Sequence, residues 1–488
     1  MELLKKEFFE VTRIAKKFDQ ASKSFQISIS YKTAAKITPR TLTVAEAFGL
    51  GIDKTQSQVL YDNLKLRISP HDIVYITGES GSGKSVLLNH LEKLLRPDTA
   101  SIQNLKIDDS NPIIETVGKT VEEGLTLLCK VGLNDAFLFL RSYRQLSDGQ
   151  KYRYRIAKLI ETKKQYWIMD EFCSTLDRDT AKIVAYNVQK LARQEGKAIL
   201  AATTHTDLQE DIAPTTHIHK RFGKEITVGT YPNKPPENCS ILEHIRIRKG
   251  SITDYYKLAQ FHYRESKRLP PPRKIFAMEH TDVNELVGVI VYSYPPPVCF
   301  GRCQTPLGRR LKFNELNNQL SLISRVILHP KYRTIGLGTK LVKDTLTLAQ
   351  TPYVEAVAVM AKYNPFFEKA GMTRIKTQRH DSTHMEAVNR LRQLGFNLHL
   401  LASEKYDKEK LEKLNPKQKT QLKNILARIK NPRLRRTLAN DPYVDYDSYR
   451  SALEKADSAK LAKTLKTLSI LTQEKIYLFW TASRQKVF

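Results

Sequence analysis

The glycine-rich stretch GESGSGKS at Gly78–Ser85 constrains the fold of this 488-residue chain more than any other feature. It fits the pattern G-x-x-x-x-G-K-[ST] and lies between a strand pattern, DIVYIT, and a helical pattern, VLLNHLEKLL, which is the context that a phosphate-binding loop requires. Glycines allow backbone N–H groups to approach phosphate oxygens, and a helix N-terminus adds partial positive charge. The sequence therefore predicts an ATP site in which Lys84 reaches the phosphates and Ser85 binds Mg2+.

A second buried strand pattern, YWIMD at Tyr166–Asp170, ends in carboxylates. We expect Asp170 to hold Mg2+ at the edge of the sheet and Glu171 to polarise the attacking water as general base. Short strand patterns alternate with amphipathic helical patterns from about residue 24 to 225. This alternation indicates an α/β domain built on a mainly parallel sheet.

Three further motifs accompany the loop and the strand: LSDGQ at Leu146–Gln150, STLD at Ser174–Asp177, and His205 in ATTHTD. In this order they resemble the motifs of ABC-type ATPases, whose signature otherwise reads LSGGQ, and the resemblance covers roughly residues 24–225. It implies a head-to-tail homodimer that closes on ATP, in which the signature of one protomer contacts the γ-phosphate held by the other. His205 would contact that phosphate from its own side as the switch histidine. The residues that would bind ATP are Gly78, Ser80, Gly81, Gly83, Lys84, Ser85, Ser147 and Gly149.

The chain departs from the ABC pattern in several places. Asp148 replaces the first glycine of the signature, and we find no convincing Q-loop glutamine, because KIDDSNPIIE occupies the expected place. Tyr31 and Phe48 are candidates for the aromatic residue that stacks on adenine. Only 61 residues separate Lys84 from Leu146, fewer than in transporter ATPases, whose subdomain there docks on a membrane partner. No run of 18 apolar residues occurs, so we expect no membrane span. The short subdomain and the unusual Q-loop region lead us to expect no transmembrane partner.

A seam rich in proline, glycine and asparagine at 229–239 precedes a second α/β pattern over residues 240–378. Within it, RTIGLG at Arg333–Gly338 fits R-x-x-G-x-G between a strand pattern and a helical pattern, and AKYNPFFEKAGM follows at Ala361–Met372. These motifs resemble those of GNAT acyltransferases, in which the turn binds the pyrophosphate of acetyl-CoA and the pantetheine arm lies between two splayed strands. The residues that would bind acetyl-CoA are Arg325, Val326, Ile327, Arg333, Thr334, Gly336, Gly338, Asn364 and Phe367.

The catalytic groups of this second site are less defined. Phe367 stands where many GNAT enzymes have a tyrosine as general acid, and a phenyl ring cannot donate a proton. Tyr363 is the nearby alternative, and Glu355 and His329 are candidates for the general base. The last two also have structural interpretations, Glu355 as an acid at a sheet edge and His329 as a turn residue before proline. Catalysis by positioning the amine and the thioester is a further alternative.

The charge of the chain indicates the class of its partner. Its formal net charge of +29 favours a polyanion such as a nucleic acid, although an evenly basic, solvated surface has the same charge. The basic region at 379–488 is expected to be mainly helical, and Leu422, Ile425, Leu426 and Ile429 in it predict an apolar stripe for docking with a cationic face outward. The residues expected to contact nucleic acid are Lys423, Arg428, Lys430, Arg433, Arg435 and Arg436. Five scattered cysteines indicate free thiols in a reducing, cytoplasmic compartment.

We interpret the chain as a helix at 1–23, an ABC-type ATPase domain at 24–228, a linker at 229–239, a GNAT-like domain at 240–378 and the basic helical region. The function that this interpretation implies is ATP-hydrolysing, acetyl-CoA-dependent acyl transfer to a nucleic acid, in which ATP remodels or gates the substrate. Two alternatives stay open: a protein acetyltransferase regulated by an ATPase switch, and a non-catalytic, ATP-gated clamp on ribosome or DNA.

Overall fold

The computed structural model divides into two compact units, and each is described by itself. It describes residues 10–19, 24–33, 37–50, 56–262, 269–308, 311–376, 382–429, 431–441, 443–472 and 475–482. The first unit takes in Met1–Ser293 and Ile323–Ala349, and the second takes in Tyr294–Leu322 and Gln350–Phe488. The expected domain at 240–378 is therefore shared between the two units.

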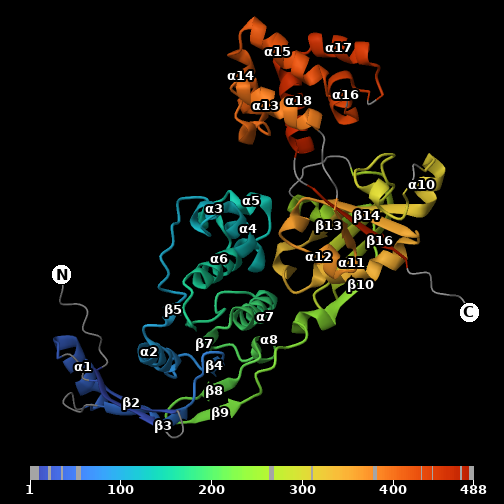
Figure 1. The fold of residues 1–488 in the computed structure, drawn as a ribbon. Helices are drawn as coiled ribbons and strands as arrows, with labels where there is room; N and C mark the ends of the chain where they lie inside the picture. Colours follow the sequence, from blue (N-terminus) through green and yellow to red (C-terminus); the bar gives the residue numbers. More distant parts are fainter. Residues whose placement is uncertain are drawn as a thin grey trace, which may run out of the picture. The chain divides into compact units, whose positions relative to one another are not determined.

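A six-stranded sheet with the order β5-β6-β7-β4-β8-β9 forms the centre of the first unit (Figure 1). Its strands are β4 (Ile73–Gly78), β5 (Thr99–Ser101), β6 (Tyr166–Met169), β7 (Ala198–Thr203), β8 (Thr216–Lys220) and β9 (Ile226–Thr230). All pairs are parallel except β8 with β9. Every residue of β4 and β7 is buried, as is typical of parallel strands covered on both faces. The predicted mainly parallel sheet is confirmed.

Helices follow the strands of this sheet. They are α2 (Lys84–Leu95), α3 (Ile113–Thr116), α4 (Val121–Lys130), α5 (Ala136–Phe139), α6 (Asp148–Glu161), α7 (Arg178–Glu195) and α8 (Gln209–Ile212). Asp177 caps α7 by accepting a hydrogen bond from the backbone of Thr180, and Gly196 ends this helix in a left-handed conformation. Because parallel strands end at the same edge of a sheet, the loops after β4, β6 and β7 meet there.

A second, three-stranded sheet contains β1 (Glu10–Asp19), β2 (Ser24–Thr33) and β3 (Gln56–Leu66), and α1 (Pro39–Phe48) lies between β2 and β3 in the chain. The helix predicted at 1–23 is wrong for residues 10–19, because they form β1, which pairs antiparallel with β2. Pairing with the next strand along the chain overrides the local helical pattern. The remainder of 1–23 lies outside the described residues.

The first unit also contains β10 (Ile245–Lys249), α9 (Ile252–Leu258), β11 (Pro272–His280), β12 (Glu285–Ser293), most of β13 (Leu320–Leu328), and α11 (Leu337–Leu346). β10, β11 and β12 are antiparallel neighbours. β12 and β13 lie side by side, since the hydroxyl oxygens of Ser293 and Ser324 are 2.7 Å apart and the backbone N–H of His329 donates to Val287 at 2.8 Å.

The second unit combines strands with a bundle of helices. Its elements are α10 (Phe313–Gln319), β14 (Tyr353–Ala358), α12 (Phe366–Lys369), β15 (Thr373–Ile375), α13 (Ser382–Gln393), α14 (Glu404–Glu412), α15 (Pro416–Ala427), α16 (Pro432–Ala439), α17 (Tyr446–Glu454), α18 (Ser458–Thr472) and β16 (Ile476–Thr481). The apolar stripe predicted around Leu422 and Leu426 lies in the core of the bundle. We did not foresee β16, which follows the helices and pairs antiparallel with both β14 and β15.

One carboxylate in the bundle makes stability depend on pH. Asp407 of α14 is fully buried, and neither of its carboxylate oxygens has a hydrogen-bond partner among the residues that the structure describes. Burial, and then the charge of Glu404, raise its pKa to about 7. The folded chain therefore keeps a proton that the unfolded chain loses, so this contribution to stability is complete below about pH 4 and is lost as the pH rises through about 7.

We expect Asp407→Asn to increase stability at pH 8 by about 1–3 kcal/mol, because the buried charge is removed. The gain should shrink at pH 5, where Asp407 is already protonated. Urea unfolding followed by the helical circular dichroism signal between pH 5 and 8 measures this difference. Asp447→Asn, at an exposed position on α17, is the control, and an equal gain from both variants at every pH would contradict the assignment.

Candidate active site

The loop between β4 and α2 has the backbone of a phosphate cradle. Gly78, Gly81 and Gly83 have φ values of 149°, 78° and 99°. A Cβ atom at Gly78 would lie 1.9 Å from the carbonyl oxygen of Lys220, so only glycine fits there. The Lys84 amine donates to the carbonyls of Gly78 at 2.9 Å and Glu79 at 2.6 Å. Burial lowers the pKa of Lys84, while the carboxylates of Asp170 and Glu79 act in the opposite direction.

Two oxygen ligands suited to Mg2+ lie together beside this loop. Ser85 lies at the start of α2, and Asp170 directly follows β6. The hydroxyl of Ser85 donates to Oδ1 of Asp170 at 3.0 Å. Hydroxyl and carboxylate oxygens are ligands that Mg2+ accepts, with phosphate oxygens and water completing the shell. Glu171 follows with φ of 46°, its backbone N–H donates to Asp170 Oδ1 at 2.9 Å, and its side chain is exposed. The structure thus brings Lys84, Ser85, Asp170 and Glu171 to one edge of the sheet.

Gln103 completes this cluster, and we did not identify it from the sequence. Its side-chain amide donates to the backbone carbonyl of Asp170. The residue follows β5, which pairs in parallel with β6, so its position depends on strand pairing. The stretch KIDDSNPIIE, where this glutamine was expected, lies after Gln103 in the chain, and β5 has only three residues, which gives a weak strand pattern.

His205 lies in the loop after β7 and is held from both ends. Its Nδ1 pairs with the guanidinium of Arg178, which also forms a 2.8 Å ion pair with Asp207, and its carbonyl accepts from the hydroxyl of Tyr75. The other ring nitrogen, Nε2, is buried and has no hydrogen-bond partner among the described residues. This arrangement fixes the ring and leaves one nitrogen to contact a ligand.

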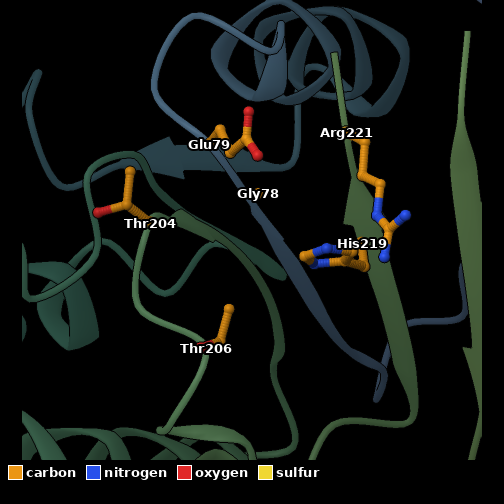
Figure 2. Close-up of a pocket in the computed structure, with 6 residues that line it drawn as sticks. All are labelled: Gly78, Glu79, Thr204, Thr206, His219 and Arg221. Atoms are coloured by element: carbon orange, nitrogen blue, oxygen red, sulfur yellow. The ribbon is translucent and has the colours of Figure 1, made fainter. Parts of the chain in front are cut away.

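A cavity of about 420 Å³ adjoins the loop (Figure 2). Gly78 and Glu79 line it from the loop, Thr204 and Thr206 flank His205, and His219 and Arg221 approach from β8 and the turn after it; only Gly78 among these was named from the sequence. Behind the loop, the Thr77 hydroxyl oxygen lies 2.8 Å from Nε2 of His217 and 3.0 Å from Nδ1 of His219. Burial and the neighbouring His219 lower the pKa of His217.

The remaining residues of the predicted ATP site are placed as follows. Ser80 and Gly81 are exposed on the loop, and Ser147 is exposed at the start of α6, where its backbone N–H donates to Gln150 at 3.1 Å. Gly149 is half-buried in the first turn of α6. Phe48 is the 76% exposed last residue of α1 and Tyr31 lies in β2, so an adenine-stacking role for either stays a prediction.

The turn at Arg333–Gly338 joins β13 to α11. Gly336 has φ of 91°, is exposed, and has no atom within 4 Å of the position that a Cβ would take. The Arg333 guanidinium donates to the carbonyl of Leu328 at 3.2 Å and to the side chain of Asn134 at 3.1 Å. The turn is therefore open at its glycine, while its arginine is buried and already engaged.

The other residues predicted for acetyl-CoA lie in both units. Arg325 and Val326 are half-buried and Ile327 is buried on β13, in the first unit. Asn364 and Tyr363 are half-buried before α12 in the second unit, where Phe367 is buried and stacks on Phe366 at 4.2 Å between ring centroids.

Glu355 does not have the surroundings of a general base. It is fully buried in β14 and accepts hydrogen bonds from Arg302 at 2.6 and 3.1 Å and from Tyr477 at 2.7 Å. These hydrogen bonds from Arg302 and Tyr477 occupy the carboxylate. Glu355 therefore has a structural role rather than that of a catalytic base, and it is buried rather than at a sheet edge. His329 is half-buried, and burial lowers its pKa. Its Nδ1 has no partner among the described residues.

The predicted nucleic-acid residues differ in their freedom. Arg428, Arg433 and Arg436 are exposed. Lys423 donates to the carbonyl of Glu454 at 2.6 Å, and Arg435 donates to the carbonyl of Val444 at 2.7 Å and lies over the ring of Tyr449. Lys423 and Arg435 therefore hold the bundle together, and Lys430 lies outside the described residues.

Comparison with known proteins identifies the nucleotide-binding part. A family model described as "ABC transporter" matches residues 61–128. The energy-coupling factor transporter ATP-binding protein EcfA of Methanosarcina acetivorans is 30% identical over 227 residues, which cover 39% of this chain and 78% of that protein. The chain belongs to the ABC transporter family of ATP-binding proteins. The ABC resemblance inferred from the motifs is confirmed, and with it the binding and hydrolysis of ATP.

Other ABC proteins also match part of the chain. The lipoprotein-releasing system ATP-binding protein LolD of Hyphomonas neptunium is 30% identical, over 32% of this chain and 86% of that protein. The α-haemolysin translocation ATP-binding protein HlyB of Escherichia coli is 25% identical, and the chain spans only 26% of its length. A solved bacterial ABC transporter cassette described as dimeric has 19% identity and a TM-score of 0.30, covering 36% of this chain and 92% of that one.

These ABC relatives qualify two expectations. Their names connect them with transporters, so the comparisons do not support the expectation that the ATPase lacks a transmembrane partner. In the described part of the chain, no helix is long and apolar enough to cross a membrane. The matches cover the ABC domain, and the acyltransferase interpretation of the residues that follow it stays a prediction.

Proposed function

We propose that this chain is an ATP-hydrolysing, acetyl-CoA-dependent acyltransferase whose acceptor is a nucleic acid. The observation that carries the acyltransferase part is the turn Arg333–Gly338, which joins a strand to a ten-residue helix and leaves open space beside Gly336. A glycine turn at a helix N-terminus offers backbone amides and partial positive charge to a pyrophosphate. Its sequence resemblance to the GNAT turn selects acetyl-CoA among such ligands.

In the proposed ATPase reaction, the loop amides and Lys84 bind the phosphates, and Glu171 takes a proton from the attacking water. Mg2+, when held by Ser85 and Asp170, supplies charge neutralisation at the β- and γ-phosphates. His205 presents Nε2 to the γ-phosphate, because Arg178 occupies its Nδ1. Gln103 donates a hydrogen bond to the Asp170 carbonyl and so links β5 to the Mg2+-binding residues. Ser147 and Gly149 would act on the ATP of a partner copy in a head-to-tail dimer.

The residues of the second site partly fit acetyl-CoA. The open Gly336 and the N-terminus of α11 fit a pyrophosphate, but Arg333 is bound to Asn134 and Leu328 and leaves only backbone amides for that group. Acetyl-CoA would supply the thioester. Tyr363 is the available hydroxyl for protonating a thiolate, since Phe367 has none. Arg325–Ile327 would offer strand amides to the pantetheine arm.

The nucleic-acid part of the proposal depends on charge. The net charge of +29 and the exposed Arg428, Arg433 and Arg436 are suited to phosphate contacts, which release counterions and weaken with salt. No base-reading motif accompanies them. The acceptor would therefore be recognised by its backbone or shape.

Calorimetry with acetyl-CoA tests the proposal. We expect the wild-type protein to bind acetyl-CoA, and Gly336→Asp to weaken binding at least about tenfold, because a carboxylate in the turn repels the pyrophosphate by roughly 1.4 kcal/mol or more. Asp tolerates a positive φ and would occupy open space. Gly49→Asp, at another open glycine with φ of 62°, is the matched control.

Incubation of the protein with radiolabelled acetyl-CoA, ATP and separated RNA, DNA and protein fractions then identifies the acceptor. Label in the RNA or DNA fraction supports the proposal, and label in the protein fraction supports a protein acetyltransferase instead. If the protein does not bind acetyl-CoA, the acyltransferase proposal fails, and the chain would be an ATPase or an ATP-gated clamp without acyl transfer.

A second candidate is the ATPase subunit of a transporter, which the names of the relatives favour. Co-purification of the tagged chain with an integral membrane protein, together with no acetyl-CoA binding, would favour this candidate over acyl transfer.

A further inference from the structure

The segment before the glycine turn contacts the nucleotide-binding domain, and one of these contacts is an ion pair made by a lysine. Lys331, in the short 3₁₀ helix η5 (Pro330–Tyr332), has its amine 3.1 Å from Oδ1 of Asp177 and 2.9 Å from Oδ2 of Asp179. Asp177 caps α7 and Asp179 lies in its first turn. We propose that Lys331 is a positioning residue for ATP hydrolysis, supplied from outside the nucleotide-binding domain.

Hydrogen bonds from α6 and α7 fix the chain on both sides of Lys331, which limits the positions that its amine can reach. The Arg153 guanidinium, on α6 and only 5% exposed, donates to the carbonyls of Pro330 at 3.3 Å and Lys331 at 2.9 Å. The side-chain amide of Asn187, on α7, donates to the hydroxyl of Thr334 at 2.5 Å. α6 begins in the signature motif, and α7 begins at the STLD motif. Both residues that hold this segment therefore lie on helices that begin at ATPase motifs.

Charge balance explains why the lysine matters. Asp177, Asp179 and Glu285 all face the Lys331 amine, with Glu285 at 3.8 Å, and the Tyr332 hydroxyl also donates to Glu285 at 2.7 Å. Burial by itself lowers the pKa of Lys331, but the contacts with Asp179 and Asp177 outweigh burial and raise it, so the amine is charged at neutral pH. Without this charge, three carboxylates would repel one another across a partly buried space.

A shift of Asp177 is transmitted to Glu171 because the short segment between them, residues 172–176, forms tight hydrogen-bonded turns. The backbone N–H of Ser174 donates to Glu171 at 3.1 Å, and that of Leu176 donates to Cys173 at 3.1 Å. Phe172 and Cys173 are fully buried. A segment fixed in this way moves as a unit, so the placement of Glu171 against the attacking water depends on the anchor at Asp177.

The inference rests on ATP hydrolysis with Glu171 as the proposed base, and it does not depend on acyl transfer. The test compares the steady-state ATPase kinetics of Lys331→Met, Lys331→Gln and Lys331→Arg with those of the wild type. Lys340→Met is the control, because Lys340 lies on α11 and its ion pair in the described part of the chain is an i,i+4 pair with Asp344 at 2.8 Å, away from Asp177 and Asp179 in sequence.

We expect both neutral variants to lower kcat about ten- to a hundredfold while KM for ATP changes less than about threefold, since geometry and not binding is lost. Lys331→Arg should retain most of the activity, and Lys340→Met should behave as wild type. Neutral variants that keep kcat within about twofold of wild type would overturn the proposal, as would an equal loss in Lys331→Arg. Two neutral variants guard against misfolding of one. If Glu171→Gln loses activity while Lys331→Met and Lys331→Gln hydrolyse ATP like the wild type, Glu171 is supported as the base and the positioning role of Lys331 is rejected.

Discussion

Glu171→Gln should bind ATP with nearly wild-type affinity and hydrolyse it about 10²- to 10⁴-fold more slowly, since a carboxamide cannot accept the proton of the attacking water. The residue follows the Mg2+-binding Asp170, its backbone is held by that carboxylate at 2.9 Å, and its exposed side chain is free to face the nucleotide. The substitution preserves size and the left-handed backbone of this position, so binding groups such as Lys84 and Ser85 should be undisturbed.

Two measurements check this result. Release of inorganic phosphate gives kcat, and fluorescent ATP analogues give affinity, with Glu210→Gln as an exposed-glutamate control outside the loop cluster. Static light scattering with ATP should show a trapped dimer for Glu171→Gln. A variant that remains monomeric with saturating ATP would contradict the head-to-tail dimer, and a variant that hydrolyses ATP normally would contradict the assignment of the base.

Arg302→Met should destabilise the second unit by about 3–5 kcal/mol, because it leaves a buried carboxylate without its cation. Arg302 makes two hydrogen bonds to Glu355 and also donates to the carbonyls of Pro296 and Pro297 at 3.0 and 3.2 Å. Glu355 is 0% exposed, and its other hydrogen-bond partner among the described residues is the hydroxyl of Tyr477. Burial, together with Glu355, raises the pKa of Tyr477, so the tyrosine stays a neutral donor.

Urea unfolding followed by tryptophan fluorescence measures the loss, since Trp480 lies on β16 beside β14. The double variant Arg302→Met, Glu355→Leu is the informative control, because replacing both members of a buried pair by apolar groups is often near neutral. We expect the double variant to recover most of the stability. A single variant within about 1 kcal/mol of wild type would show that the pair is accessible to water, and Glu355 would return as a candidate base.

The ATPase core was predictable because its determinants are local in sequence. GESGSGKS needs only its own glycines and the adjoining helix to form a cradle, and Asp170 and Glu171 sit next to the strand that places them. The same local logic failed for residues 10–19, where pairing with β2 produced a strand. It also failed for Gln103, whose partner is the carbonyl of Asp170, 67 positions along the chain.

The second site shows the same division more strongly. RTIGLG predicted a glycine turn between a strand and a helix, and the structure has one, with an open Gly336. The sequence could not assign the arginine of that motif to Asn134, Lys331 to Asp177 and Asp179, or Glu355 to Arg302 and Tyr477. Each of these pairs joins residues more than 50 positions apart. Local motifs predicted where the chain would hold phosphate groups, while long-range burial and charge pairing, which no short pattern encodes, decided which side chains are engaged by other protein groups.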